Sequence, residues 1–371
     1  MTRTWKEMAF GDLPIREDLK SQHAYGAPQL DVPIRLNVNE NPYPPSPDLV
    51  ARIAEAIAAV AKEANRYPDR DFAKLRESLA EYLRHDSGIA IAAKHIWAGN
   101  GSNEVLQHIL QVFGGPGRTA LAFTPAYPMY EEYCRTTFTH LHRVPRNARF
   151  EIDFAEAIDA IETVQPSVVF LTSPNNPTGT ALSIDTIQAV LDVAPGIVIV
   201  DEAYAEFRRD GVPTAVSLLP DNPRLIVSRT LSKAFKFAGG RVGYCACVAS
   251  IIEAIQLVRL PYHLSVFTQA AACAALAARD ELLAQVATLK AERDATVAWL
   301  RGIGLRVADS DANFVLFGEF SDRHAIWNAL LREGVLIRET GPNGFLRVSI
   351  GTASEMDAFR ETLQRALAEH R

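Results

Sequence analysis

The chain has 371 residues, of which 48 % are hydrophobic and 22 % charged, a composition that fits a globular protein with two domains. Its formal net charge of −6 offers no basic surface for nucleic acid, and its most apolar late stretch, residues 266–278, is too short and alanine-rich to cross a bilayer. The four cysteines lack the spacing of zinc ligands and no apolar signal core opens the chain, so we expect a metal-free, reduced, cytoplasmic enzyme.

The first hundred residues predict an arm followed by helices. Residues 1–34 show no clean period and contain scattered glycine and proline, which indicates an arm with one short helix near residues 15–21. Apolar residues then recur every three to four positions in residues 48–64 and 75–83, which predicts two amphipathic helices. A polar, glycine-containing turn at residues 99–103 opens a third helix.

From about residue 119, short apolar runs alternate with helical patterns. Buried strands separated by amphipathic helices indicate a largely parallel sheet that is covered on both faces. We expect the last run to be an antiparallel strand at the edge of this sheet. The runs expected to be strands are residues 119–123, 168–172, 197–200, 225–227 and 242–248.

The pattern changes after Pro261, where an alanine-rich helical region with room for a break leads into shorter elements typical of an α+β domain. We therefore expect an N-terminal arm (1–34) that packs with the small domain and a partner subunit, a large domain (35–262) and a small domain (263–371). The elements expected in the small domain are helices at 265–300, 322–332 and 354–369 and strands at 314–317, 335–337 and 345–350.

Lys233 follows the apolar run 225–227, at the position where α/β proteins hold their ligands. An amine that loses its proton when desolvated suits carbonyl chemistry, and Arg241, after a glycine pair, offers a guanidinium for a phosphate. Together the two predict an aldehyde cofactor with a phosphate group, namely pyridoxal phosphate. The alternative is that Lys233 is a solvated surface residue, as most lysines are. Lys236 is expected on the surface or on a helix face.

A second predicted anion site is the turn that opens the helix after residue 103. Gly101, Ser102 and Asn103 would present free amide groups at the positive end of the helix dipole. Ser102 or Asn103 acting as a plain N-cap explains the same turn equally well. Ser232 and Arg241 could close on the same phosphate.

Asp201 stands at the end of the run 197–200, where a carboxylate could be a metal ligand, a helix cap or an ion-pair partner. Beside a pyridine cofactor, Asp201 has a more specific role. Its carboxylate would face the ring nitrogen and keep that nitrogen protonated, which keeps the ring electron-withdrawing. Tyr204 follows three residues later and could donate to the ring oxygen. Glu202 and Glu206 are expected to be surface residues or local caps.

Two further turns follow predicted strands. Asn176 lies after the run 168–172, where its amide could donate to an acceptor on the ring, although a purely structural turn also explains the neighbouring proline and glycine. Tyr127 lies after the run 119–123, where an aromatic side chain is more often part of the core.

These motifs resemble the signature of fold-type I aminotransferases. The matching segments are Thr230-Leu231-Ser232-Lys233 with Arg241, the PNNPTG turn at residues 174–179, and Asp201-Glu202-Ala203-Tyr204, and the resemblance extends from Leu36 to Gly351. It implies an α/β fold in which a large domain with a mostly parallel seven-stranded sheet stands beside a smaller α+β domain.

The resemblance also implies roles for individual residues. Lys233 would carry the cofactor and act as the general base that moves the proton of the substrate α-carbon. Tyr127 would stack on the cofactor ring, while Asn176 and Tyr204 would contact its 3′-oxygen. The cofactor-binding residues implied are Lys233, Gly101, Ser102, Asn103, Tyr127, Asn176, Asp201, Tyr204, Thr230, Ser232, Arg241 and Tyr67.

Within the family, the sequence looks most like the group of histidinol-phosphate aminotransferases, through residues 24–26, 36–42 and 346–352. This implies histidinol phosphate and 2-oxoglutarate as substrates. Arg347 would bind the substrate α-carboxylate, or else be a plain surface arginine. Arg338 would bind the substrate phosphate, or else pair with Glu339.

The same likeness names Tyr25 as a second phosphate contact and Asn39 as a further substrate contact. Tyr67 resembles a tyrosine that reaches across a subunit interface to the cofactor phosphate. We therefore expect a two-fold symmetric homodimer.

Three rival functions share these motifs. An aromatic amino acid aminotransferase would keep the chemistry and change the side chain accepted, and a phosphoamino-acid decarboxylase would release carbon dioxide without an amino-group acceptor. A cofactor-sensing regulator would need an attached DNA-binding module, and the sequence predicts none before the core.

Overall fold

The computed structural model describes residues 5–370, which form two compact units, one ending at Asp31 and the other beginning directly after it. The first unit contains two 3₁₀ helices, η1 (Phe10–Asp12) and η2 (Glu17–Leu19), and neither buries a residue. The helix expected near residues 15–21 is therefore only a 3₁₀ turn, because a short segment without a buried apolar face gains too little packing energy to extend a helix.

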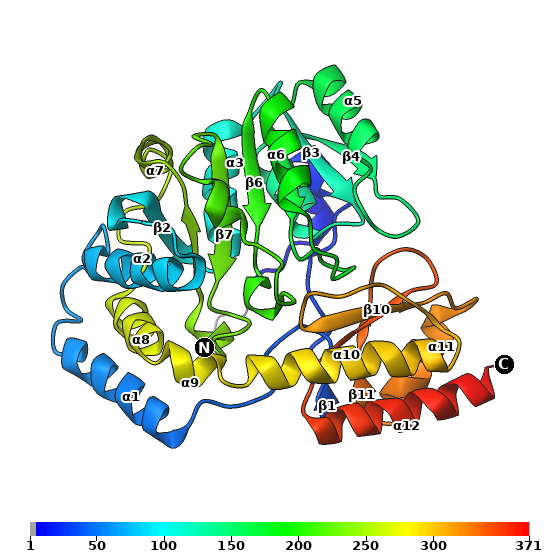
Figure 1. The fold of residues 1–371 in the computed structure, drawn as a ribbon. Coiled ribbons are helices and arrows are strands. Elements are labelled where there is room, and N and C mark those ends of the chain that lie inside the picture. Colours follow the sequence, from blue (N-terminus) through cyan, green and yellow to red (C-terminus); the bar gives the residue numbers. More distant parts are fainter. Residues whose placement is uncertain (1–4, 371) are drawn as a thin grey trace. The chain divides into compact units, whose positions relative to one another are not determined.

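The second unit is built around a sheet to which the described residues contribute seven strands, in the order β2-β8-β7-β6-β5-β3-β4. Figure 1 shows β2 and β4 on opposite sides of the central strands. β8 runs antiparallel to both of its neighbours, and the other six strands all point the same way. The strands are β2 (Ile96–Asn100), β3 (Thr119–Thr124), β4 (His140–Pro145), β5 (Val168–Thr172), β6 (Ile197–Asp201), β7 (Leu225–Thr230) and β8 (Val242–Ala246).

The mostly parallel sheet implied by the sequence is confirmed, with one correction. β8 is antiparallel as predicted, but it lies between β7 and β2 rather than at the edge. The edges are β2 and β4, which the sequence did not reveal as strands. β2 ends in Gly99-Asn100, which resembles a turn, and β4 carries exposed polar residues because an edge strand is covered less completely than a central one.

Helices pack against this sheet and leave strands β5 to β8 buried along their whole length. Helix α3 packs on β2, β7 and β8, while α4 and α5 pack on β4. Helix α1 begins as predicted, because Ser46 Oγ accepts the Leu49 amide at 3.1 Å and a proline occupies the first turn. The helices are α1 (Pro47–Ala61), α2 (Ala73–Ser87), α3 (Ser102–Phe113), α4 (Met129–Thr136), α5 (Phe154–Val164), α6 (Ile184–Val193) and α7 (Ala249–Gln256).

The C-terminal part has a second, antiparallel sheet of order β12-β13-β10-β9 in the described residues. The long alanine-rich region is divided into three helices, and the other predicted elements are confirmed to within a residue or two. The elements are α8 (Val266–Ala277), α9 (Arg279–Leu283), α10 (Val286–Gly302), β9 (Arg306–Val307), β10 (Phe314–Gly318), α11 (Arg323–Arg332), β11 (Val335–Leu336), β12 (Arg338–Glu339), β13 (Leu346–Ser349) and α12 (Ala353–Glu369).

One segment, residues 36–45, here called the strap, connects the two sheets. It follows β1 (Ile34–Arg35), which pairs in parallel with β11. The Leu36 amide donates to the Leu336 carbonyl at 2.7 Å, and the Ser349 amide donates to the Leu36 carbonyl at 2.9 Å. The strap thus starts between β11, which forms a separate two-stranded sheet with β1, and β13 of the antiparallel sheet. The division of the chain at residues 34/35 and 262/263 stays a prediction.

Among the described helices, none is long and apolar enough to cross a membrane. Within residues 5–370, no three histidine, cysteine, aspartate or glutamate side chains come together as a metal site.

Candidate active site

The carboxyl ends of the parallel strands lie along one edge of the large sheet, and most of the predicted site residues follow them. Thr172, Asp201 and Ser228 are cross-strand neighbours near the ends of β5, β6 and β7. Ligands bind at this edge in open α/β sheets. The topology therefore brings together turns that are far apart in the sequence.

Lys233 lies in the turn after β7, with its side chain largely enclosed. Its Nζ donates a hydrogen bond to the Val38 carbonyl of the strap at 2.9 Å and lies 6.0 Å from the centre of the Tyr204 ring. The pKa of Lys233 is lowered from 10.5 to about 8, mainly by burial and next by the charge of Arg347; Glu40 opposes this shift and Arg241 adds to it. The side chain is partly buried and its amine is hydrogen-bonded to the strap, so Lys233 is not a freely solvated surface residue.

The start of helix α3 forms a cradle beside Lys233. The N-cap is Gly101, with φ +82°, so neither Ser102 nor Asn103 is the N-cap and that alternative is wrong. A Cβ on Gly101 would collide with the Arg241 guanidinium, and a Cβ on Gly243 would collide with the Ser102 amide. Only glycines allow β8, Arg241 and the helix start to approach this closely.

Arg241 is joined to the turn that carries Lys233. Its Nη1 donates to Ser232 Oγ at 3.3 Å and to the Ala238 carbonyl at 3.2 Å. Thr230 Oγ1 donates to Ser232 Oγ at 3.0 Å and also accepts the Ser232 amide at 3.2 Å. A guanidinium, two hydroxyls and the first amides of α3 thus surround one position, which is the donor set that a phosphate requires.

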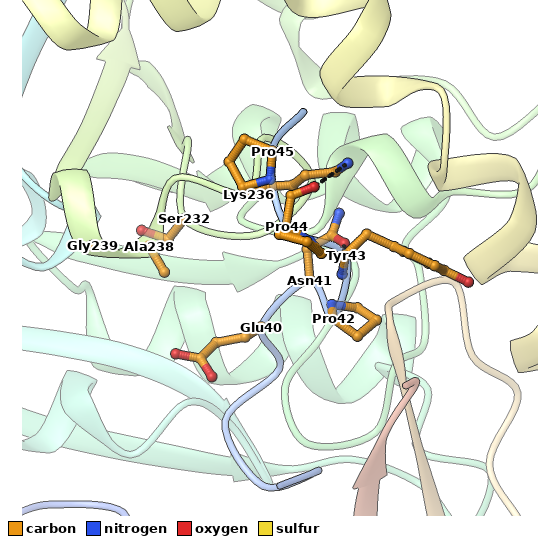
Figure 2. Close-up of a pocket in the computed structure, with 10 residues that line it drawn as sticks. All are labelled: Glu40, Asn41, Pro42, Tyr43, Pro44, Pro45, Ser232, Lys236, Ala238 and Gly239. Carbon is orange, nitrogen blue, oxygen red and sulfur yellow. Dashed lines mark hydrogen bonds between the residues drawn. The ribbon is translucent and has the colours of Figure 1, made fainter. Parts of the chain in front are cut away.

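A cavity of about 290 Å³ borders this cradle, between the strap and the turn at residues 232–239. Figure 2 shows Glu40 pointing away from the prolines of the strap, and Lys236 reaching the Pro44 carbonyl. Lys236 also donates to Gln285 Oε1 at 2.5 Å, and its φ is +54°. It is therefore a partly exposed turn residue that joins the strap to the start of α10; of the two expected positions, surface or helix face, the helix face is wrong.

Asp201, 3 % exposed, is held by two hydroxyl groups. Tyr130 donates to its Oδ2 at 2.9 Å and Ser228 donates to its Oδ1 at 3.0 Å. Burial raises the pKa of Asp201, while these two hydrogen bonds partly counter the shift. A buried carboxyl whose side-chain donors are neutral is suited to a ligand that brings a positive N–H group.

Tyr130 was missed by the sequence analysis, which chose Tyr127 from the same turn. The Tyr130 ring stacks on Phe170 at 4.3 Å, so it belongs to the wall behind Asp201. Tyr127 packs edge-on against Tyr130 at 5.7 Å, and its hydroxyl donates to Asn103 Oδ1 at 3.3 Å. Tyr127 is half-buried next to the cradle, where its ring face can meet a planar ligand.

Asn176 and Arg347 are in direct contact although 171 residues separate them. Nη1 of Arg347 donates to Asn176 Oδ1 at 2.5 Å, and Nη2 donates to the Asn37 carbonyl of the strap at 2.9 Å. Arg347 is buried and packs over the Phe314 ring at 5.1 Å. It is not the plain surface arginine of the alternative prediction.

Arg338 is the register partner of Arg347 on the neighbouring antiparallel strand. Directly opposed residues on such strands point to the same face of the sheet, so both side chains leave from one side. Glu339 was the alternative partner predicted for Arg338. Its carboxylate accepts a hydrogen bond from Arg323 Nε at 3.1 Å and lies 3.1 Å from His324 Nδ1.

Asn39 is fully enclosed where the strap crosses between the sheets. Its Nδ2 donates to the Tyr204 hydroxyl at 3.0 Å, and its Oδ1 accepts from Ser349 Oγ at 2.9 Å. Tyr204 follows β6 and is itself buried, with its ring edge-on to Phe314 at 5.0 Å. The structure thus brings Asn39 to the predicted cofactor residue Tyr204.

Two predicted site residues have exposed side chains. Tyr67 is 81 % exposed and stacks on Tyr262 at 4.6 Å. Tyr25 belongs to the unit that ends at Asp31 and is 47 % exposed. The roles proposed for both residues stay predictions.

Glu202 and Glu206 were expected to be surface residues or local caps, and the surface alternative is wrong, because both side chains are enclosed. Glu202 is buried and forms an ion pair with Arg229 at 2.8 Å, while its carboxylate also accepts from Thr214 Oγ1 at 2.7 Å. Glu206 is partly buried beside them, with a side chain that is 5 % exposed, and it accepts from Tyr82 at 2.8 Å. The turn after β6 directs these side chains away from solvent, into a buried ionic cluster between β6, β7 and α2.

Comparison with known proteins gives the class first. Residues 31–363 match the family described as aminotransferase class I and II, and the chain belongs to that family. A curated relative from Burkholderia lata, histidinol-phosphate aminotransferase 3, is 72 % identical over 368 residues, covering 99 % of this chain and 100 % of the relative. The histidinol-phosphate aminotransferase of Thermobifida fusca is 58 % identical over 355 residues, covering 96 % of each chain.

Solved structures show the same fold. The histidinol-phosphate aminotransferase of Sinorhizobium meliloti, in complex with pyridoxal-5′-phosphate, is 25 % identical with a TM-score of 0.81, over 91 % of this chain and 92 % of that one. N-succinyldiaminopimelate aminotransferase from Mycobacterium tuberculosis is 23 % identical with a TM-score of 0.79, over 91 % and 93 % of the two chains. The second likeness concerns the fold alone.

Proposed function

We propose that the protein is a pyridoxal-phosphate-dependent transaminase that exchanges an amino group between L-histidinol phosphate and 2-oxoglutarate. The products would be imidazole-acetol phosphate and L-glutamate. The names of the full-length relatives support this proposal. The structural observation that carries it is the pair of arginines, Arg338 and Arg347, opposed on adjacent strands beside a lysine whose pKa is lowered to about 8.

The residues present fit the cofactor. The amides of Ser102 and Asn103, with Ser232, Thr230 and Arg241, would hold its phosphate, because they converge on one uncapped helix start. The lack of a side chain at Gly101 leaves room for this approach.

The other face of the site fits the cofactor ring. Asp201, buried with neutral donors, would pair with the protonated ring nitrogen. Asn176 and Tyr204 would contact the ring oxygen, and Tyr127 would cover the ring. When bound, the cofactor supplies an electron sink for the substrate α-carbon.

Lys233 has two tasks in this scheme. Its neutral Nζ would hold the cofactor through the aldehyde group, and the same amine would act as the general base that takes the α-carbon proton of the substrate. A pKa of about 8 suits both tasks, because a large share of the amine is neutral near pH 8. The Val38 carbonyl orients this amine from the strap.

The two arginines account for both substrates. Glutamate carries a carboxylate on its α-carbon, whereas histidinol phosphate carries a phosphate one carbon further out and has no carboxylate. Arg347 would bind either anion, and Arg338 beside it would supply the second guanidinium that a phosphate needs. Tyr25 is the further phosphate contact that we propose.

The active form is proposed to be a homodimer. Tyr67, with Tyr262, Leu257 and Leu260, leaves large apolar side chains exposed, which is typical of a surface that meets a partner. In a two-fold symmetric pair, the Tyr67 hydroxyl would reach the partner's cofactor phosphate. The cytoplasmic location stays a prediction.

The deciding experiment mixes the pyridoxal-phosphate-loaded protein with single amino donors and follows the loss of the cofactor's visible absorbance. L-Histidinol phosphate and glutamate should discharge the absorbance rapidly. L-Histidinol, which lacks only the phosphate, and L-phenylalanine should react at least about 100-fold less efficiently, because charge-assisted hydrogen bonds to two arginines are lost.

The rivals predict other results. Faster reaction of phenylalanine than of histidinol phosphate would point to an aromatic amino acid aminotransferase. Release of carbon dioxide without any need for 2-oxoglutarate would point to a decarboxylase.

A further inference from the structure

Asn39 and Ser349 form a closed ring of hydrogen bonds that joins the strap to the smaller sheet. The backbone N–H of Asn39 donates to Ser349 Oγ at 2.9 Å, and Ser349 Oγ donates back to the side-chain Oδ1 of Asn39 at 2.9 Å. The Ser349 hydroxyl group therefore accepts one hydrogen bond and donates one. This exchange fixes which end of the Asn39 carboxamide faces Ser349.

The other end of the carboxamide faces Tyr204. Asn39 Nδ2 can act only as a hydrogen-bond donor, so the Tyr204 hydroxyl oxygen is the acceptor of this hydrogen bond, at 3.0 Å. The proton of Tyr204 is consequently directed to an acceptor other than Asn39. Because Ser349 fixes the carboxamide, it indirectly fixes the direction in which Tyr204 donates.

The backbone holds Asn39 rigidly in this position. Asn39 is 2 % exposed and has φ +58°. Its backbone carbonyl accepts a hydrogen bond from Asn313 Nδ2 at 3.0 Å. Asparagine is one of the few residues that adopts positive φ without a large penalty. The positive φ and the full enclosure of Asn39 hold its side chain in one orientation toward Tyr204. A residue that only contacts a substrate does not need to be held in this way.

We infer that Asn39 is a positioning residue that acts through Tyr204: it receives its orientation from Ser349 and directs the Tyr204 proton toward the ring oxygen of the cofactor. The inference rests on the proposed function, since it presumes that pyridoxal phosphate binds beside Tyr204. It assigns Asn39 a different role from the substrate contact expected from the sequence. It also makes Ser349, two residues from Arg347 on β13, part of the cofactor's environment.

The electrostatic consequence has a definite sign. A hydrogen bond donated to the ring oxygen stabilises the more negative, deprotonated form of the bound cofactor. Loss of this donation therefore raises the pH at which the visible absorbance changes. One hydrogen bond of this kind corresponds to about one pH unit.

The charged groups around Tyr204 stay in place in this comparison. Lys233 Nζ lies 6.0 Å from the ring, Arg347, Glu40 and Arg241 act on Lys233, and Asp201 begins the turn that carries Tyr204. A shift caused by an alanine exchange at Asn39 or Ser349 therefore reports the hydroxyl orientation, because it changes no charge; the charge added by Asn39→Asp needs its own control.

The test is a pH titration of the visible absorbance of the full-length, pyridoxal-phosphate-loaded protein. Tyr204→Phe should raise the titration midpoint by about one unit. Asn39→Ala should raise it in the same direction, and Asn39→Asp at least as much, because a carboxylate accepts the Tyr204 proton and draws it away from the cofactor. Ser349→Ala should cause a smaller rise. The double variant Asn39→Ala/Tyr204→Phe should titrate like Tyr204→Phe alone.

Asn41→Asp is the matched control. It adds the same charge to the same strap, but Asn41 Nδ2 donates to the Ala234 carbonyl at 3.2 Å and not to Tyr204. This variant should leave the midpoint near the wild-type value.

Two results would overturn the inference while leaving the proposed function intact. One is an Asn39→Ala protein that raises the KM for histidinol phosphate with an unchanged titration, which would make Asn39 a substrate contact. The other is additive shifts in the double variant. If Asn39→Ala does not fold, Ser349→Ala and Asn39→Asp decide the question by the same criterion. A wild-type protein without a visible cofactor band would instead contradict the proposed function.

Discussion

Arg338 and Arg347 face each other across adjacent antiparallel strands, where each is the register partner of the other. Two guanidinium groups on one face of a sheet repel each other unless an anion lies between them. We propose that a doubly charged group such as a phosphate binds to both arginines, and that this relationship separates the two proposed substrates.

We predict that Arg338→Gln raises the KM for histidinol phosphate about 10- to 100-fold, because it removes charge-assisted hydrogen bonds worth about 1.5–3 kcal/mol. The reaction with glutamate, whose α-carboxylate is held by Arg347, should change much less. Steady-state kinetics with each donor measure the difference. Arg347→Lys is the companion variant and should impair both donors, since it loses the two-pronged geometry. Equal losses for both donors in Arg338→Gln would argue against a phosphate role.

The lowered pKa of Lys233 predicts a pH dependence for attachment of the cofactor. Only the neutral amine attacks an aldehyde, so the attachment rate should rise with pH up to about 8 and level off above it, because the folded protein holds the amine's pKa near 8 and not at 10.5. Stopped-flow mixing of cofactor-free protein with pyridoxal phosphate measures this rate. N-acetyl-lysine in the same buffers corrects for ionisation of the cofactor itself.

Arg347 is the nearest control for that experiment, because its charge is the second largest cause of the lowered pKa of Lys233. Arg347→Met should move the midpoint upward. A wild-type midpoint close to 10.5 would show that burial does not perturb this amine.

Gly101 and Gly211 provide a matched pair for the cradle. Both have nearly the same positive φ, +82° and +83°, but a Cβ on Gly101 would strike Arg241 whereas one on Gly211 meets open space. Alanine at either position should cost about 1 kcal/mol of stability from backbone strain. Only Gly101→Ala should also weaken pyridoxal phosphate binding, by about tenfold or more.

Equilibrium dialysis of the two glycine variants measures the cofactor affinity, and thermal unfolding measures the stability. Equal cofactor affinity in the two variants would show that the contact between Gly101 and Arg241 is irrelevant to the phosphate.

The buried ion pair of Glu202 and Arg229 predicts a large effect on stability. Glu202→Gln removes one of the two carboxylates nearest the buried Arg229 guanidinium, at 2.8 Å, and leaves Asp86 at 2.7 Å, so we expect a loss of about 1.5–3 kcal/mol. Denaturant unfolding at matched protein concentration measures the loss. Asp210→Asn, which breaks an exposed pair with Lys290, serves as the control and should have no measurable effect. Equal stabilities of the two variants would contradict the structural reading of the cluster.

The site residues that the sequence predicts best are those that belong to short, contiguous sequence motifs. Asp201 ends one apolar strand and Lys233 closely follows another, and parallel strands bring their carboxyl ends to one edge. Arg241 immediately precedes the antiparallel strand β8, whose first residues pair with the end of β7 at the same edge. For these residues, strand identity alone gives an approximate position. The large sheet is predicted for the same reason, apart from its two polar edge strands.

The remaining parts depend on register and long-range packing, which one sequence does not express. The hydrogen bonds of Asn39 to Ser349 and of Tyr130 to Asp201 join residues 310 and 71 positions apart. Glu202 looks like a surface residue, because its buried partner Arg229 lies 27 positions away on the next strand. Ser228 could have been found by pairing β6 with β7 in register, since it is the direct neighbour of Asp201.

The central claim is that the amine of Lys233 carries the cofactor in the resting protein. The most direct measurement is borohydride reduction of the purified, pyridoxal-phosphate-loaded protein, followed by peptide mass mapping. The label should be found on the peptide containing Lys233 and should be absent after Lys233→Ala. A label on Lys236 or any other lysine, or no label at all, would contradict the account.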